Sequence, residues 1–162
     1  MHRRLAVALL VALVTLAGCA ALSPTGAPLL TVDNRDDTEY RLSVYALPDV
    51  ENPGDLTVRA TDGNGDRRSV SLADLRTSGS YRNVTLEGTD VTPRHITLRA
   101  AANTSAAINV WNPGDATVYV IETTDGTASL VGVHVVTCGT SDQEHATTIA
   151  NGTIDDRSMT CP

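Results

Sequence analysis

The feature that most constrains the fold is an alternation of apolar and polar residues that begins at Leu29 and runs nearly to the end of the chain. Between positions 40 and 46, Tyr40, Leu42, Val44 and Ala46 share one face, and the residues between them share the other. A period of two is typical of a strand with one buried face. No stretch sustains a helical period, so the sequence predicts an all-β domain.

The alternation recurs in six further segments, and two others are apolar on both faces. About nine short strands without crossover helices favour an antiparallel, immunoglobulin-like β-sandwich of about seven to nine strands. We expect the doubly apolar segments 117–121 and 129–136 to be central strands, and the tail 146–154 to add an edge strand. The six alternating segments are 29–33, 56–60, 70–72, 84–86, 96–98 and 108–110.

A four-residue block occurs twice, as Asn52-Pro53-Gly54-Asp55 and as Asn112-Pro113-Gly114-Asp115. Pro followed by Gly at the centre predicts a type II turn, which does not match the twist of a tight hairpin. We therefore expect both blocks to carry the chain from one sheet to the other.

Trp111 precedes the second block, and we expect its ring to fill the end of the core. The alternative is an exposed ring that stacks on a sugar or a partner.

The first 18 residues have the layout of an export signal. Two arginines, Arg3 and Arg4, precede an apolar run of 13 residues from 5 to 17, whereas a helix that spans a bilayer needs about 20. The motif Leu16-Ala17-Gly18-Cys19 resembles the lipobox of lipoproteins, in which the peptide is cut before the cysteine and a lipid is attached to its sulfur. The resemblance implies removal of residues 1–18 and a protein held at the outer face of the cell membrane by lipid on Cys19.

Two alternatives stay open for this leader. A plain secretory signal cut near Ala20 or Ala21 would discard Cys19. The paired arginines also leave the export route, twin-arginine or general secretory, undecided. In the lipoprotein interpretation residues 19–28 form the lipidated cysteine and a short linker, and residues 29–162 form the sandwich. The nine linker residues after Cys19 span only about 30 Å when stretched, so the domain would work close to the lipid surface.

Composition excludes one class of partner. Without the leader, the chain has ten arginines and no lysine against 19 acidic residues, a net charge of −9. A nucleic acid would be repelled. The absence of Lys and Phe with abundant Asp and Thr resembles the proteins of extreme halophiles. In molar salt the Debye length shrinks to about 3 Å, so an acidic surface repels itself little. Together these features resemble a haloarchaeal exported surface lipoprotein.

Three cysteines are present, and lipidation of Cys19 would leave Cys138 and Cys161. An even remainder in an exported chain predicts a disulfide between them, with two free thiols as the alternative.

One segment has some features of a calcium loop. Asp62, Asn64 and Asp66 offer oxygen ligands at alternate positions, but Arg67 and Ala73 stand where an EF-hand needs Gly and Glu. We expect an acidic, glycine-rich turn, with calcium binding as the alternative.

Four residues near the end of the chain, His134, Cys138, His145 and Met159, resemble the ligand types of blue copper sandwiches. The gaps between them are longer than in that family, and positions 134 and 138 lie about 13 Å apart on one strand. We therefore do not expect a copper redox centre. His95 is expected to face solvent.

Asn83, Asn103 and Asn151 each begin an N-glycosylation sequence. No Gly-x-Ser-x-Gly, His-Glu-x-x-His or Walker motif is present in the sequence. We therefore expect a membrane-anchored, non-catalytic module that binds a surface protein or glycan or supports the envelope. A metal-dependent exported domain is the alternative, either stabilised by calcium or, as the less favoured form, a copper redox carrier.

Overall fold

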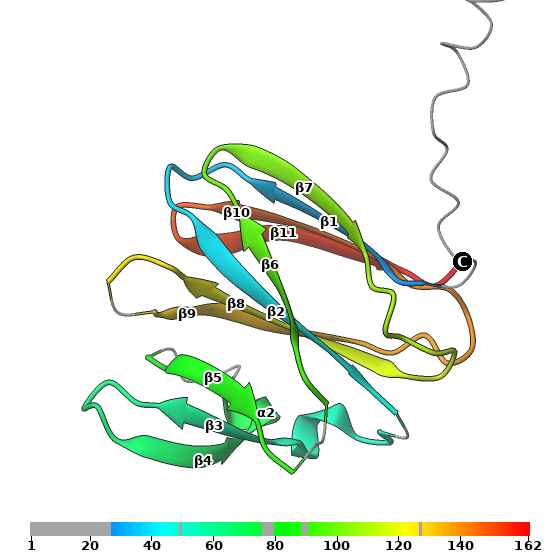
Figure 1. Ribbon diagram of the computed structural model, residues 1–162, viewed down its shortest axis with the longest axis horizontal. Helices are drawn as coiled ribbons and strands as arrows, with labels where there is room; N and C mark the ends of the chain where they lie inside the picture. Colours follow the sequence, from blue (N-terminus) through cyan, green and yellow to red (C-terminus); the bar gives the residue numbers. More distant parts are fainter. Residues whose placement is uncertain (1–26, 49, 76–79, 89–90, 127) are drawn as a thin grey trace, which may run out of the picture.

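The structure is a computed structural model that describes residues 27–48, 50–75, 80–88, 91–126 and 128–162. The predicted signal peptide, Cys19 and most of the linker lie outside the described residues. Within these residues, eleven strands form three sheets, stacked in three layers (Figure 1). The predicted all-β, immunoglobulin-like class is confirmed. The strands are β1 Leu29–Asn34, β2 Tyr40–Leu47, β3 Thr57–Thr61, β4 Arg67–Ser71, β5 Arg82–Leu86, β6 Arg94–Leu98, β7 Ala102–Ala107, β8 Ala116–Thr123, β9 Leu130–Val136, β10 Glu144–Ala150 and β11 Thr153–Thr160.

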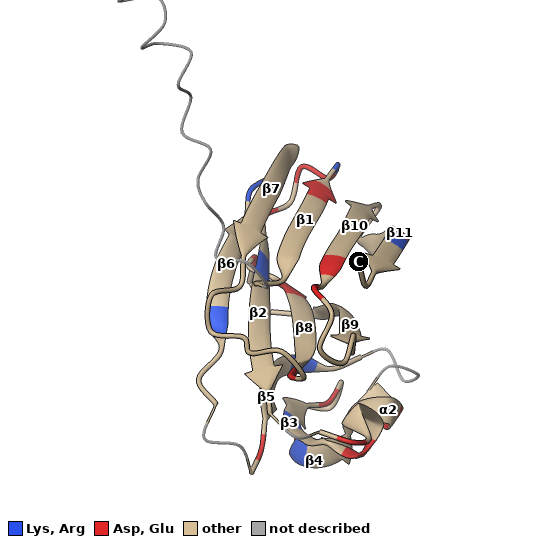
Figure 2. Ribbon diagram, turned by 90° about the vertical axis from the view of Figure 1, so that its right-hand side faces the viewer, with Lys and Arg blue, Asp and Glu red and all other residues tan. Residues whose placement is uncertain are grey.

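The outer sheet has the strand order β11-β10-β1-β7, the middle sheet β6-β2-β8-β9 and the small sheet β4-β3-β5 (Figure 2). All pairs are antiparallel except β1 with β10, which run parallel. The outer and middle sheets form the expected sandwich. The small sheet is an addition built from the chain between β2 and β6, which also contains a 3-10 turn at Pro53–Asp55 and a short helix α2 at Leu72–Leu75.

The middle sheet is covered on both faces. On β8, Tyr119 and Ile121 belong to the core shared with the outer sheet, whereas Val118 and Val120 belong to the core shared with the small sheet. Because every face of β8 meets apolar neighbours, its sequence is apolar at consecutive positions. The prediction that β8 is central is confirmed. The same prediction for β9 is wrong, because β9 lies at the edge of the middle sheet and is apolar on both faces for the same layered reason.

Two other strand predictions need correction. The tail supplies two strands, and β10 lies inside the outer sheet while β11 forms its edge. The segment 108–110 is not a strand: β7 ends at Ala107, Ile108 is buried and Val110 is exposed. Ile108 and Val110 are spaced as in an alternating strand, but Ile108 fills the core just beyond the end of β7.

Both Asn-Pro-Gly-Asp blocks connect different sheets, as expected. The first joins β2 to β3 and the second joins β7 to β8. At the second block, the Asp115 amide donates to the Asn112 carbonyl and Gly114 has a φ of 102°, which fits the predicted type II turn. At the first block the prediction is wrong, since residues Pro53–Asp55 form a 3-10 turn.

The sandwich closes tightly between β9 and β11. Gly132 on β9 faces Ile154 on β11 so closely that a Cβ at position 132 would overlap the Ile154 side chain. Within the described ranges, no helix has the length and apolar character needed to cross a membrane.

A buried carboxylate joins the middle sheet to the small sheet. The Glu122 side chain on β8 is only 1% exposed, and its Oε2 lies 2.8 Å from Nη2 of Arg41. Its Oε1 accepts a hydrogen bond of 3.1 Å from the main-chain amide of Val84 on β5. Both oxygens of a charge taken out of water therefore have partners, which burial of an ion requires.

We expect Arg41→Ala to lower the free energy of unfolding by about 2 to 3 kcal/mol, because it leaves the Glu122 carboxylate buried without its counter-ion. The loss is below the roughly 3–5 kcal/mol of a fully buried pair, since Arg41 is partly exposed. Arg35→Ala is the matched control, because its ion pair with Asp33 is exposed, and it should cost at most about 0.5 kcal/mol. Denaturant unfolding at constant salt measures both; equal losses would refute the structural role of Glu122.

Candidate functional site

Both described chain ends lie at the same end of the outer sheet. Leu29, the first residue of β1, pairs with Glu144 of β10, and Glu144 pairs with Thr160 at the end of β11. We call this the anchor end, because the predicted tether enters the domain there. It lies on the side marked C in Figure 1.

Five connections gather at the opposite end of the domain, which we call the loop end (Figure 1). The strands β2 and β8, of eight residues each, span about 27 Å between the two ends at about 3.4 Å per residue. The loop end therefore lies well away from the point where the tether enters. The five connections are residues 35–39, 62–66, 99–101, the described residues of 124–129, and 151–152.

Asp36 ties two of these connections together. Its carboxylate accepts hydrogen bonds from the main-chain amides of Asn151, at 2.6 Å, and Gly152, at 2.9 Å, and from the Tyr40 hydroxyl, at 2.6 Å. These donors hold the pKa of Asp36 below its usual value, the Tyr40 hydroxyl contributing most. Burial and the neighbouring carboxylate raise the pKa of Tyr40 above its usual value. Asp36 thus stays an acceptor and Tyr40 a donor at neutral pH.

Asn34 brings in a third connection. Its buried side chain donates from Nδ2 to the carbonyls of Thr38 and Arg99, both at 2.9 Å, and accepts from the Asp36 amide at 3.1 Å. The loop end is therefore held in one arrangement, which lowers the ordering cost of binding a partner. Sequence reasoning missed this cluster because most of the partners are main-chain groups from distant segments.

The three glycosylation asparagines are all exposed. Asn83 faces outward beside the buried Val84, as predicted, and Asn151 lies in the β10–β11 turn of the loop end. Asn103 pairs with Asp33 toward the same end of the outer sheet. Each side chain is accessible to a glycan, and glycosylation itself stays a prediction.

The calcium candidates form a turn that is satisfied by its own chain. Asp62 Oδ1 accepts from the amides of Asn64, at 2.9 Å, and Asp66, at 3.0 Å, while Asp62 Oδ2 lies 2.9 Å from Arg68 Nε. Arg68 also contacts Asp66 at 3.3 Å. An arginine thus occupies the position where a cation would need the carboxylates, so the residues fit calcium poorly. Among the described residues, no group of three His, Cys, Asp or Glu side chains is arranged to hold a metal.

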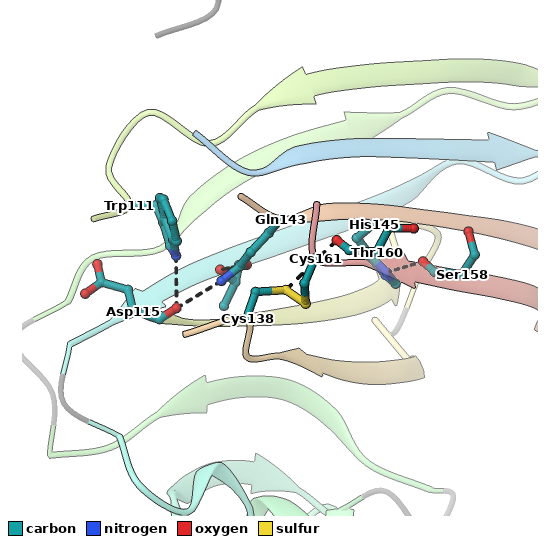
Figure 3. Close-up of a disulfide and its surroundings, with 9 residues drawn as sticks. Trp111, Asp115, Cys138, Gln143, His145, Ser158, Thr160 and Cys161 are labelled. Carbon is teal, nitrogen blue, oxygen red and sulfur yellow. Dashed lines mark hydrogen bonds between the residues drawn. A yellow bond between two sulfur atoms is a disulfide. The ribbon is translucent and has the colours of Figure 1, made fainter. Parts of the chain in front are cut away.

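The four copper candidates are not assembled as a blue copper site. Cys138 is bonded to Cys161, with an S–S distance of 2.03 Å, so it offers no thiolate. The predicted disulfide is present (Figure 3). His95 is exposed, as expected, and its Nδ1 lies 3.0 Å from the Ser43 hydroxyl.

Two of the four candidates, His134 and His145, do come together. His134 on β9 and His145 on β10 are 4% and 5% exposed, and His134 Nδ1 lies 3.0 Å from His145 Nε2. The Tyr119 ring stacks on His145 with centroids 4.9 Å apart. Spacing along one strand could not reveal this pair, because its members lie in different sheets and meet only when the sandwich closes.

The hydrogen bonds fix the tautomers of this pair. His145 Nδ1 lies 3.1 Å from the Ser158 carbonyl, which only accepts, so Nδ1 carries the proton (Figure 3). The lone pair of His145 Nε2 therefore faces His134, and His134 Nδ1 donates to it. Burial lowers the pKa of His145, outweighing the Ser158 hydrogen bond, so the ring is neutral at neutral pH.

We expect the domain to lose stability as pH falls below about 6.5. The lowered pKa of folded His145 means that the unfolded chain, with its ordinary value of 6.5, binds more protons just below that pH. The contribution is complete above 6.5 and is lost on acidification. Denaturant unfolding between pH 7.5 and 5 should show a downward slope that His145→Gln flattens. An unchanged slope in His145→Gln would contradict the assignment.

At the anchor end, the core is closed by a series of side-chain hydrogen bonds and by the disulfide. Trp111 is buried and belongs to the core beneath the outer sheet, as predicted. Its Nε1 and the Gln143 amide both donate to the Asp115 carbonyl, at 2.9 and 3.1 Å (Figure 3). Thr117 donates to Gln143 Oε1 at 2.9 Å. The ring is therefore part of the structure and is not available to stack on a sugar.

The disulfide fastens the end of β11 to the chain that follows β9. We expect the double variant Cys138→Ser, Cys161→Ser to be less stable by about 3 kcal/mol, because the bond closes a segment with a sequence separation of 23 residues in the unfolded state. Thermal unfolding of the variant and of the oxidised protein gives the difference. Cys19→Ser should leave the melting temperature unchanged, and a similar loss in that control would argue against the explanation.

The outer and middle sheets form an immunoglobulin-like sandwich, to which the small sheet is added. The chain belongs to the family described as "Halobacterial Ig domain protein", whose family model matches residues 1–161. Among curated proteins, none matches the sequence. A solved structure described as "Trapped Toxin" aligns at 10% identity and a TM-score of 0.33, over 83% of this chain and 23% of that one. The chain thus spans about a quarter of that protein, and so low a score carries no argument.

Proposed function

We propose that the protein is a lipid-anchored, non-catalytic surface module that presents its loop end away from the membrane. The observation that carries the proposal is the position of Leu29: β1 starts at the anchor end, while the rigid connections lie at the other end. A tether attached through residues 19–28 would therefore direct the loop end outward.

The sequence of the leader supports the anchor. The lipobox resemblance at Leu16 to Cys19 supplies the lipid attachment site, and the family match extends over this segment. The linker after Cys19 reaches about 30 Å. The loop end would stand about 27 Å farther out, along the length of the long strands. Any partner would thus be met within several tens of ångströms of the membrane surface.

The loop end suits the binding of a surface protein or a glycan, or a contact within the envelope. The hydrogen bonds of Asp36 and Asn34 hold three connections in place without any added ligand. Asp37, Glu39 and Asp125 are exposed there, so the surface is acidic and strongly hydrated. Such a surface disfavours nucleic acid and suits a partner with basic or hydroxyl groups. A glycan on Asn151 would project from this same end.

The experiment that tests the anchor is Cys19→Ser in the native host. Removing the sulfur that accepts the lipid should shift the protein from the membrane fraction to the medium or soluble fraction and change its gel mobility. Fractionation followed by immunoblotting measures the shift, and mass spectrometry of the wild-type N-terminus should find lipid on Cys19.

Ser23→Ala is the matched control, since it alters the linker and leaves the lipobox intact, and it should remain in the membrane fraction. If Cys19→Ser stays in the membrane fraction with unchanged mobility, the anchor proposal is wrong. Release of both variants would point instead to cleavage near Ala20 or Ala21.

A further inference from the structure

The buried histidine pair opens onto a small pocket between β9 and β11. The pocket has a volume of about 250 Å³. Met159 on β11 is the register partner of His145, so the two side chains lie on the same face of the outer sheet. The Met159 side chain is 53% exposed, which leaves it free to move toward the pair. The lining residues are His134, Val135, Val136, His145, Arg157, Ser158 and Met159.

We propose that this pocket binds one copper(I) ion, held by Nδ1 of His134, Nε2 of His145 and the sulfur of Met159. The site differs from a blue copper centre, because it contains no thiolate and its metal need not change oxidation state. It does not depend on the lipid anchor or on the loop end.

The metal would take the place of the proton that His134 Nδ1 now donates to His145 Nε2. His145 Nε2 already directs a lone pair at His134 Nδ1. When copper binds, the proton on His134 Nδ1 moves to Nε2 of the same ring, so both facing nitrogens become ligands and no net proton is released. Metal–nitrogen bonds of about 2.0 Å place two ligand nitrogens about 3.3 Å apart in a tetrahedral arrangement, compared with the present 3.0 Å. The two rings must also turn, so that both lone pairs point at the metal and no longer along the line between the two nitrogens.

The surroundings of His145 match those of a metal ligand. Its second ring nitrogen is bonded to the Ser158 carbonyl, which fixes the tautomer and orients the ring, as the outer partner of a ligating histidine does. The Tyr119 ring stacks on it and restricts rotation.

The ligand types select copper(I) from other ions. A thioether favours copper(I), and imidazole suits copper and zinc. The pocket lining includes no carboxylate, whereas calcium and magnesium require oxygen ligands. Arg157 also lines the pocket, and its charge opposes any cation. Its side chain is exposed, so water screens that repulsion. The effect of Arg157 supplies a separate test of the site.

The test uses the full-length chain carrying Cys19→Ser, which removes the one cysteine outside the disulfide. Copper(I), kept reduced with ascorbate in chloride-free buffer, is titrated in competition with the chromophoric chelator bicinchoninate. We expect one equivalent to bind. His145→Gln, His134→Gln and Met159→Leu should each weaken binding by at least about tenfold. Arg157→Gln should strengthen it, and His95→Gln should leave it unchanged.

Met159→Leu keeps the test valid if a histidine variant unfolds, because position 159 is exposed and the change preserves side-chain volume; thermal unfolding without metal confirms its fold. A rise in melting temperature on adding copper(I), lost in Met159→Leu, would support the site independently. Affinity that is the same in Met159→Leu and His95→Gln would overturn the proposal. So would binding of zinc that depends on both histidines with no competitive binding of copper(I).

Discussion

Burial of the middle sheet on both faces is the constraint on which the other features depend. A sheet covered by two neighbours must be apolar at consecutive positions, so each polar side chain that is buried within it needs a hydrogen-bond or ion-pair partner. Glu122 meets Val84 of the small sheet, and His134 and Thr117 meet His145 and Gln143 at the outer sheet. Polar contacts between the layers are therefore few, specific and fixed by strand register.

The same layering gives the molecule two distinct ends. The turns of all three sheets lie at the ends of the strands. Different interactions stabilise the two ends of the domain. At the anchor end, the disulfide and the hydrogen bonds that join Trp111, Asp115 and Gln143 close the core where the predicted tether would enter. At the loop end, one carboxylate, Asp36, gathers main-chain donors from a remote turn. The first arrangement suits mechanical attachment, and the second suits a rigid surface for recognition.

Local patterns in the sequence predicted the structural features that are determined by residues close together in the chain. Alternation located most strands, the Pro-Gly block at Pro113 gave the second turn, and cysteine counting gave the disulfide. The third layer was not predictable, because an edge strand covered on both sides, such as β9, has the same composition as a central one. The His134–His145 contact was missed for a related reason: it depends on how two sheets close, and spacing along a strand says nothing about that.

The Asp36 carboxylate and the His134–His145 pair differ in what each contributes to the fold. The Asp36 carboxylate accepts three hydrogen bonds, two of them from the turn at residues 151–152, and without it this turn would lose its link to the β1–β2 connection through Asp36. The hydrogen bond of the histidine pair joins β9 to β10, but its contribution to stability is small. A hydrogen bond between neutral groups contributes only about 1 kcal/mol net, whereas two apolar side chains of similar volume would pack there without the cost of desolvating four ring nitrogens. The neighbouring positions Val136 and Leu30 are filled in that way. Stability therefore gives little reason for facing imidazoles at this point, and the lone pair directed between them is the property that an apolar pair would lack.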